Sequence, residues 1–334
     1  NLGSLEMELE IISNLNAMVS MDSANGHIAA NYNVPVISLW GLTHPFGGYG
    51  PSFANPRTGQ LLGADIMLEY SFLNRSTLAR ELIQGESIQE KISFLWPEMH
   101  TCLVSKVLNM GTAFAQSALN FSDASVSAHE QLLRDRMYYL ILHEIGHTLG
   151  MNHNMKATQI FSREQIQDPE VLQSGVLAGS VMDYPAVNYA PTEEEQTLFY
   201  TIAPGPYDDW YIEWAYSPGH EDPDGEIARL EAIASRSSEP ELVFGNDADD
   251  MRSPGTGLDP RVNIYDLSSD SIGYAASQME LMQATLNKMA TWMPDFGDSH
   301  QETVEGASLI IRLWSISAGV ISRWGGGVYV DRAM

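Results

Sequence analysis

The chain has 334 residues and a net charge of −26, from 43 acidic and 17 basic side chains. We therefore expect no nucleic-acid partner and no membrane partner, because DNA, RNA and anionic lipid would all repel so acidic a protein. Hydrophobic residues make up 44% of the chain, as in ordinary globular proteins. No apolar run approaches the roughly 20 residues of a membrane span, since Arg312 and two serines interrupt the stretch 309–321.

The chain begins at Asn1 and contains a single cysteine, Cys102. We interpret this start as that of a portion excised from a longer precursor, so its targeting cannot be read directly. One cysteine forms no intrachain disulfide and says little about the compartment. We expect Cys102 to be a small buried hydrophobic residue. The sequence does not indicate an oligomeric state.

In the first third of the chain, hydrophobic spacing and turn residues predict helices and strands. The expected elements are a helix over 5–19, a strand over 34–40, a turn over 55–59, a strand over 61–70, and helices over 75–91 and 103–119. In the strand over 61–70, polar Asp65 and Glu69 alternate with apolar Ile66 and Leu68, which indicates that one face is buried. These residues support two interpretations equally: an ordinary hairpin strand, or an edge strand that pairs with an extended peptide.

A long helix is predicted over 128–149, where apolar residues recur at helical spacing and Ser127 with Glu130 fits a capping box. Beyond it the predicted elements are mainly helical. The expected helices cover 192–200, 207–216, 226–235, 270–293 and 299–324. The apolar positions of the last two fit the packing of one helix on the other.

The end of the long helix carries the pattern H-E-x-x-H-x-x-G-x-x-H, formed by His143, Glu144, His147, Gly150 and His153. Two histidines four residues apart share a helix face and can bind one zinc ion, while Glu144 can reach a metal-bound water without binding the metal. Gly150 permits the left-handed turn that ends a helix, after which the chain can return His153 as third ligand. Three protein ligands leave one position open, which is typical of a catalytic zinc site.

Two later segments carry further candidate residues. Met182 and Tyr184 lie in a Ser-x-Met-x-Tyr segment that begins at Ser180. A methionine turn here would support the histidine rings from beneath the metal, and Tyr184 would point its hydroxyl at the zinc. The segment 246–250 offers oxygen ligands of the kind that calcium prefers, but it lacks the glycine and distal Glu of an EF-hand loop. A solvated acidic loop is therefore favoured over a calcium site.

With these residues the chain resembles the metzincin clan of zinc endopeptidases. The zinc motif at 143–153 falls on the clan's signature, and 180–184 falls on its Met-turn. The Tyr two residues after the Met resembles the version in which that Tyr can ligate zinc and swing away to stabilise the transition state. The segment 62–66 resembles the clan's edge strand above the cleft, which implies that Gly63, Ala64 and Asp65 bind substrate.

More narrowly, the chain is similar to a group of large bacterial zinc-dependent metalloproteases that includes toxin A-subunit homologues. The shared segments are 50–52, 56–59, 180–185, 207–210, 259–263 and 326–330. The resemblance implies an α+β, zincin-like catalytic domain, with a mixed twisted sheet, an active-site helix and a mainly helical C-terminal portion. It implies an N-terminal subdomain over 1–153, a Met-turn subdomain over 154–265 and a helical extension over 266–334. It also implies a secreted or periplasmic bacterial location.

The motif and the resemblance together predict an endopeptidase with one catalytic zinc, acting on a protein or peptide substrate through a zinc-bound water that Glu144 activates. Tyr184 would donate a hydrogen bond to the developing oxyanion. Two alternatives stay open. One is a metal-dependent hydrolase of another amide bond, such as one in peptidoglycan. The other is a non-catalytic zinc-binding protein, against which the presence of Glu144 argues.

Overall fold

The computed structural model describes residues 18–21, 36–40, 48–49, 52–69, 104–122, 124–249, 258–291 and 301–331. The chain divides into two compact units. The first comprises Asn1–Lys106 and His143–Met151, and the second comprises Val107–Leu142 and Asn152–Met334. The expected subdomain boundaries after residues 153 and 265 stay a prediction. The expected helix over 75–91 and the residue Cys102 lie outside the described residues.

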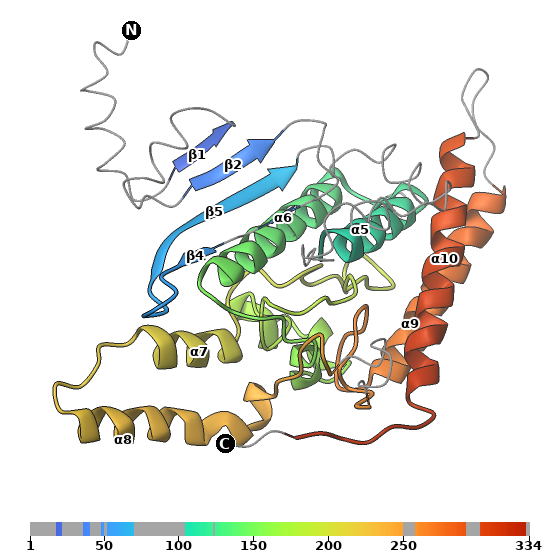
Figure 1. Cartoon of the computed structure of the whole chain (residues 1–334). Coiled ribbons are helices and arrows are strands. Elements are labelled where there is room, and N and C mark those ends of the chain that lie inside the picture. Colours follow the sequence, from blue (N-terminus) through green and yellow to red (C-terminus); the bar gives the residue numbers. More distant parts are fainter. Residues whose placement is uncertain are drawn as a thin grey trace, which may run out of the picture. The chain divides into compact units, whose positions relative to one another are not determined.

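The first unit contains a mixed β-sheet, in which β1, β2 and β5 lie side by side (Figure 1). Its strands are β1 (Met18–Met21), β2 (Val36–Trp40), β3 (Gly48–Tyr49), β4 (Ser52–Ala54) and β5 (Leu61–Glu69). The pairs β1–β2 and β2–β5 are parallel, whereas β3 and β4 pair with β5 antiparallel. The strands predicted over 34–40 and 61–70 are thus confirmed in type. The helix predicted over 5–19 is wrong at its end, because residues 18 and 19 belong to β1.

Strand β5 is not an edge strand along its whole length, because Met67 and Leu68 have strand partners on both sides. The role of Gly63, Ala64 and Asp65 in substrate binding stays a prediction. Asp65 is paired with Val36 of β2, and the register with β3 on the other side covers only Met67 and Leu68. Gly63 and Ala64 are paired with β4, and the register with β2 begins only at Asp65. Alternation of polar and apolar residues indicates that one face of a strand is buried, but it does not indicate whether the strand lies at the edge or in the middle of the sheet.

The second half of the chain is mainly helical. The long helices are α5 (Val104–Asn120), α6 (Val126–Thr148), α7 (Pro206–Tyr216), α8 (Pro223–Ala234), α9 (Ser271–Thr291) and α10 (Gln301–Arg323). Short 3-10 helices cover Ala157–Ile160, Gln165–Gln167, Val171–Ser174, Ser235–Ser238 and Pro240–Leu242. The helix predicted over 192–200 is wrong, since this segment forms turns, bends and irregular chain. There the Gln196 side chain bonds to the backbone of Asn188 and Ala190, which competes with helical hydrogen bonds.

Helix α6 begins two residues before its predicted start. The side chain of Ser125 accepts a hydrogen bond of 3.2 Å from the backbone N–H of Ala128, so Ser125 is the N-cap. The predicted capping box of Ser127 and Glu130 is therefore wrong, because both residues lie inside the helix. Leu132, Tyr139 and Leu140 are among the buried residues of this helix. Its C-terminal end contains the first part of the zinc motif.

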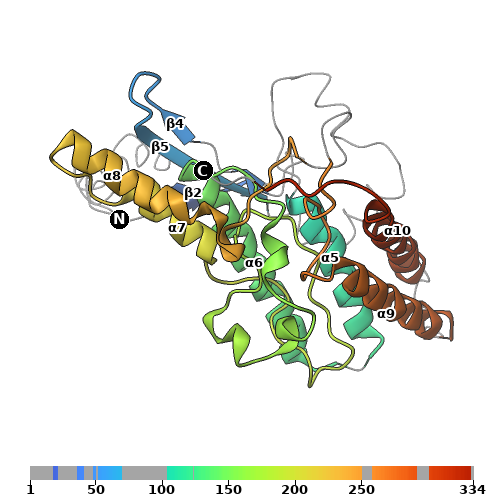
Figure 2. The same ribbon diagram turned by 90° about the horizontal axis from the view of Figure 1, so that it is seen from below.

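Helices α9 and α10 run side by side in both views (Figures 1 and 2). Their buried apolar residues, including Met282 on α9 and Leu313 on α10, confirm the predicted helix-on-helix packing. By length and composition, residues 303–323 of α10 are long and apolar enough to cross a membrane, and 33% of that segment is buried. The expectation that no apolar run approaches the length of a membrane span is therefore wrong for this helix, although core helices of soluble proteins meet the same criterion. The absence of a membrane partner stays a prediction.

Candidate metal centre

The last turns of α6 place two histidines beside one another. The ring centroids of His143 and His147 are 4.9 Å apart, with the rings nearly perpendicular at 86°. His143 is fully buried. The Nδ1 atom of His147 lies 3.1 Å from the backbone carbonyl of Met151. A hydrogen bond from Nδ1–H to this carbonyl fixes the tautomer and leaves Nε2 of His147 as the ligand atom.

Gly150 ends the helix in the predicted left-handed conformation, with φ +86°. The N–H of Met151 bonds to the carbonyl of Gly146 at 3.0 Å, and the N–H of Gly150 bonds to the carbonyl of His147 at 3.0 Å. This pair of hydrogen bonds is a Schellman motif with Gly150 at its left-handed position. A side chain at Gly150 would strain the turn, and the turn reverses the chain towards His153.

The three histidines converge. Ligand nitrogens of His143, His147 and His153 all lie within 4.8 Å of one another. Three imidazole nitrogens at this spacing fit the donor set of a catalytic zinc site, with one position left for substrate or water. Asn154, which follows the third histidine, is anchored by its N–H to the carbonyl of Met182 at 2.9 Å and by its side chain to the carbonyl of Val243 at 2.9 Å.

Glu144 is the acid of the motif, and its side chain is fully buried. It lies in the last two turns of α6, between the two helical ligands in sequence. Its role as the base that activates water stays a prediction.

The turn over 180–184 is held by Asp208 of α7. The Asp208 carboxylate accepts hydrogen bonds from the Ser180 hydroxyl at 2.5 Å and from the Val181 N–H at 2.9 Å. Ser180 in turn accepts from the N–H of Met182 at 3.0 Å, and the Met182 side chain is fully buried. Burial raises the pKa of Asp208, an effect that these hydrogen bonds oppose. Asp208 lies in the segment 207–210, where nothing in the local sequence marks its contact with Ser180, 28 positions away.

Tyr184 reaches the third histidine. Its hydroxyl lies 2.8 Å from Nε2 of His153, and the two ring centroids are 4.7 Å apart. The structure thus brings Tyr184 and His153 together, and the interpretation of 180–184 as a Met-turn stays a prediction. Tyr139 of α6 also contacts this turn, since its hydroxyl donates to the backbone carbonyl of Asp183 at 2.7 Å.

A buried pair of acids, Asp183 and Asp266, supports the same turn from within. Asp183 accepts hydrogen bonds from the N–H groups of Thr158 at 3.0 Å and Tyr184 at 2.6 Å. Burial and the negative charge of Asp266 raise the pKa of Asp183 well above its ordinary value. Burial also raises the pKa of Asp266 to about 7, although hydrogen bonds from Ser271 and Thr158 oppose the shift.

Lys156, three residues after His153, is buried among acids from distant parts of the chain. Its ammonium lies 3.3 Å from Asp259 and 3.2 Å from Asp331, and it donates to the carbonyl of Val330 at 3.0 Å. Burial works against the charge of Asp259, yet hydrogen bonds from Arg261 and Val330 and the charge of Lys156 lower the pKa of Asp259 to about 2. A buried lysine in this position is stable only while its partners are present.

The acidic segment 246–250 does not support calcium. Asp247 lies 2.7 Å from Nδ1 of His153, and Asp249 accepts a hydrogen bond of 3.2 Å from the N–H of Asn246. Within the described residues 246–249, both carboxylates thus contact protein groups, and nothing there supports a calcium site. The contact of Asp247 with His153 joins residues 94 positions apart, and nothing in the local sequence marks it.

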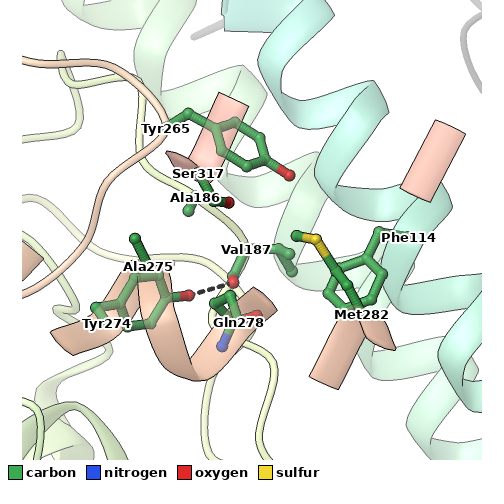
Figure 3. Close-up of a pocket in the computed structure, with 9 residues that line it drawn as sticks. All are labelled: Phe114, Ala186, Val187, Tyr265, Tyr274, Ala275, Gln278, Met282 and Ser317. Atoms are coloured by element: carbon green, nitrogen blue, oxygen red, sulfur yellow. Dashed lines mark hydrogen bonds between the residues drawn. The ribbon is translucent and has the colours of Figure 1, made fainter. Parts of the chain in front are cut away.

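A small cavity lies among α5, α9, α10 and the segment 186–187 (Figure 3). Its volume is about 10 Å³, which suits one water and no organic ligand. Its lining residues are Phe114, Ala186, Val187, Tyr265, Tyr274, Ala275, Gln278, Met282 and Ser317, and none of them belongs to the zinc motif. Within the described part of the chain, the Tyr265 hydroxyl has no hydrogen-bond partner, whereas the Tyr274 hydroxyl donates to the carbonyl of Val187 at 2.5 Å.

This difference between two buried tyrosines predicts different effects of removing the hydroxyl. We expect Tyr274→Phe to lower the free energy of unfolding by about 1 kcal/mol, because it removes a buried hydrogen bond. Tyr265→Phe is the matched control and should change that free energy much less. Urea unfolding of the two variants measures the difference. Equal losses would mean that the Tyr265 hydroxyl also has a partner, such as a water in the cavity.

Comparison with known proteins gave matches to two family models. Residues 125–334, which contain the zinc motif and the turn over 180–184, match a family model described as Met-zincin. Residues 3–55 match a model of glycosyltransferase family 9, the heptosyltransferases, over a short part of the chain that excludes the motif. Searches of curated proteins and of solved structures gave no match.

Proposed function

Since the chain belongs to the Met-zincin family, we propose that it is a zinc-dependent endopeptidase that cleaves internal bonds of a protein or peptide substrate. The family and the three converging histidines make it a zincin-type zinc metallopeptidase in general. The observation that carries the finer proposal is the contact of 2.8 Å between the Tyr184 hydroxyl and Nε2 of His153. The Tyr184 hydroxyl is thus a hydrogen-bond donor beside the histidine cluster that can stabilise the transition state.

In this proposal the residues have distinct roles. His143, His147 and His153 hold the zinc, which when bound polarises the scissile carbonyl and lowers the pKa of a water molecule. Glu144 would accept a proton from the attacking water and would donate it to the leaving amine. Tyr184 donates a hydrogen bond to the oxyanion that develops on the carbonyl. Met182, buried in its turn, holds the backbone beneath the histidines.

We propose that the substrate binds along β5. Gly63 and Ala64 pair with β4, and among the described residues their other side has no strand partner. This supports the hypothesis that an extended peptide adds to β5 there through backbone hydrogen bonds. Asp65, paired with Val36, is a weaker candidate for the same role. We also propose that the mixed sheet and α6 together form the zincin-like catalytic domain.

The chain's charge of −26 supports a function without nucleic acid or anionic lipid as a partner. The resemblance to exported bacterial metalloproteases supports a secreted or periplasmic location. Fractionation of cells that express the full-length gene product would test the proposed location.

The proposed function predicts one zinc per chain and metal-dependent cleavage at internal bonds. Elemental analysis of protein purified without chelator measures the zinc, and mass spectrometry of products from a peptide library maps the cleaved bonds. Removal of zinc by a chelator should abolish cleavage, and added zinc should restore it. Release of terminal residues alone, or no cleavage by the zinc-loaded protein, would contradict an endopeptidase. Absence of any transition metal would contradict the site itself.

A further inference from the structure

We propose that Asp247 is a positioning residue for the third metal ligand, His153. Its carboxylate accepts the Nδ1–H of His153 and so presents Nε2 to the metal. The inference rests on the proposed zinc site but not on peptidase activity. It adds a residue outside the zinc motif to the surroundings of the metal.

The geometry gives each nitrogen of the His153 ring one partner. Nδ1 lies 2.7 Å from Oδ2 of Asp247, and Nε2 lies 2.8 Å from the Tyr184 hydroxyl. A carboxylate only accepts hydrogen bonds, so the proton of the neutral ring belongs on Nδ1. Nε2 then keeps its lone pair, which is the atom that a metal requires.

Backbone pairing of the residues just before Asp247 positions it next to His153. The N–H of Met155 donates to the carbonyl of Gly245 at 2.7 Å, and the N–H of Gly245 donates to the Asn154 side chain at 3.2 Å. Residues 243–245 thus run beside the two residues that follow His153. The Asn246 side chain then accepts from the N–H of Ala248 at 3.0 Å, which forms a turn with Asp247 inside it.

Exposure distinguishes this contact from an ordinary surface ion pair. The His153 side chain is only 14% exposed, whereas Asp247 is 62% exposed. A pair so exposed on one side contributes little to folding stability, so its role lies in the orientation of the ring. The comparable hydrogen bond of His147 goes to the neutral carbonyl of Met151. An anionic acceptor raises ligand basicity, and mutation of such partners typically weakens metal affinity about 10- to 100-fold.

The test measures zinc affinity of the purified chain by competition with a chromogenic chelator. We expect Asp247→Asn and Asp247→Ala to weaken zinc binding about 10- to 100-fold, with the larger loss for Asp247→Ala. Asp249→Asn is the matched control, because it removes one charge from the same turn while its side-chain oxygen can still accept from Asn246. It should bind zinc within about twofold of wild type. The absorption spectrum of the cobalt-substituted protein should change with Asp247→Asn and not with Asp249→Asn.

Three results would overturn the proposal. They are unchanged affinity in both Asp247 variants, an equal loss in Asp249→Asn, and a loss accompanied by a lower unfolding midpoint of the metal-free protein. These results are separable from failure of the proposed function. Wild-type protein that binds zinc and cleaves no peptide would contradict the endopeptidase and leave the role of Asp247 intact.

Discussion

Glu144→Gln is expected to abolish nearly all peptidase turnover while the zinc content stays at the wild-type level. The amide has almost the same shape as the carboxylate but cannot accept the proton of the attacking water. Loss of a positioned general base typically costs 10²- to 10⁴-fold in rate, and we expect a decrease of about that size in kcat on casein. The three histidines that hold the metal are untouched, so elemental analysis should find unchanged zinc.

Glu130→Gln is the control for this experiment. Glu130 lies on the same helix, α6, and is exposed. Its substitution changes the charge of the chain by the same amount and should leave kcat and zinc content near wild type. Full activity of Glu144→Gln would show that another group is the base, whereas loss of zinc would show that Glu144 contributes to holding the metal.

The second large effect is expected for Tyr184→Phe, which should lower kcat more than it raises KM. The hydroxyl next to Nε2 of His153 is placed to bind charge that develops only in the transition state. Removal of one such donor elsewhere costs about 3–4 kcal/mol, or about 10²- to 10³-fold in kcat. Steady-state kinetics on a fluorogenic peptide measure both constants.

The control for Tyr184 is Tyr138→Phe, which removes a phenolic hydroxyl from an exposed residue of α6. It should leave both kinetic constants near wild type. A variant Tyr184→Phe with normal kcat and raised KM would mean that the hydroxyl binds the substrate in its ground state.

The parts of the site that lie close together in sequence were predictable. Spacing alone places His143 and His147 on one face of a helix, and the left-handed φ of Gly150 is what a helix ending there requires. Helices α7, α9 and α10 also lie within a few residues of their predicted ranges. In each case the information is local: hydrophobic period, capping residues and the conformational freedom of glycine.

Contacts between distant segments were not predictable from one sequence. Ser180 meets Asp208 across 28 positions and His153 meets Asp247 across 94, and both acids resemble solvated surface residues when only their neighbours in sequence are considered. The pairing of Asp65 with β2 was missed for the same reason. Strand order and side-chain partners depend on the tertiary fold, whereas propensity and periodicity report on short windows.

The ion pairs of Lys156 have a consequence for the order in which the protein is made. The zinc motif ends at His153, but two of the partners of Lys156, Val330 and Asp331, lie 174 and 175 positions after Lys156. A nascent chain therefore exposes all three metal ligands long before the residues that complete the surroundings of Lys156 have been synthesised. Contacts of such long range form late and slowly in folding. The surroundings of Lys156 are thus completed only after the whole zinc motif has been synthesised.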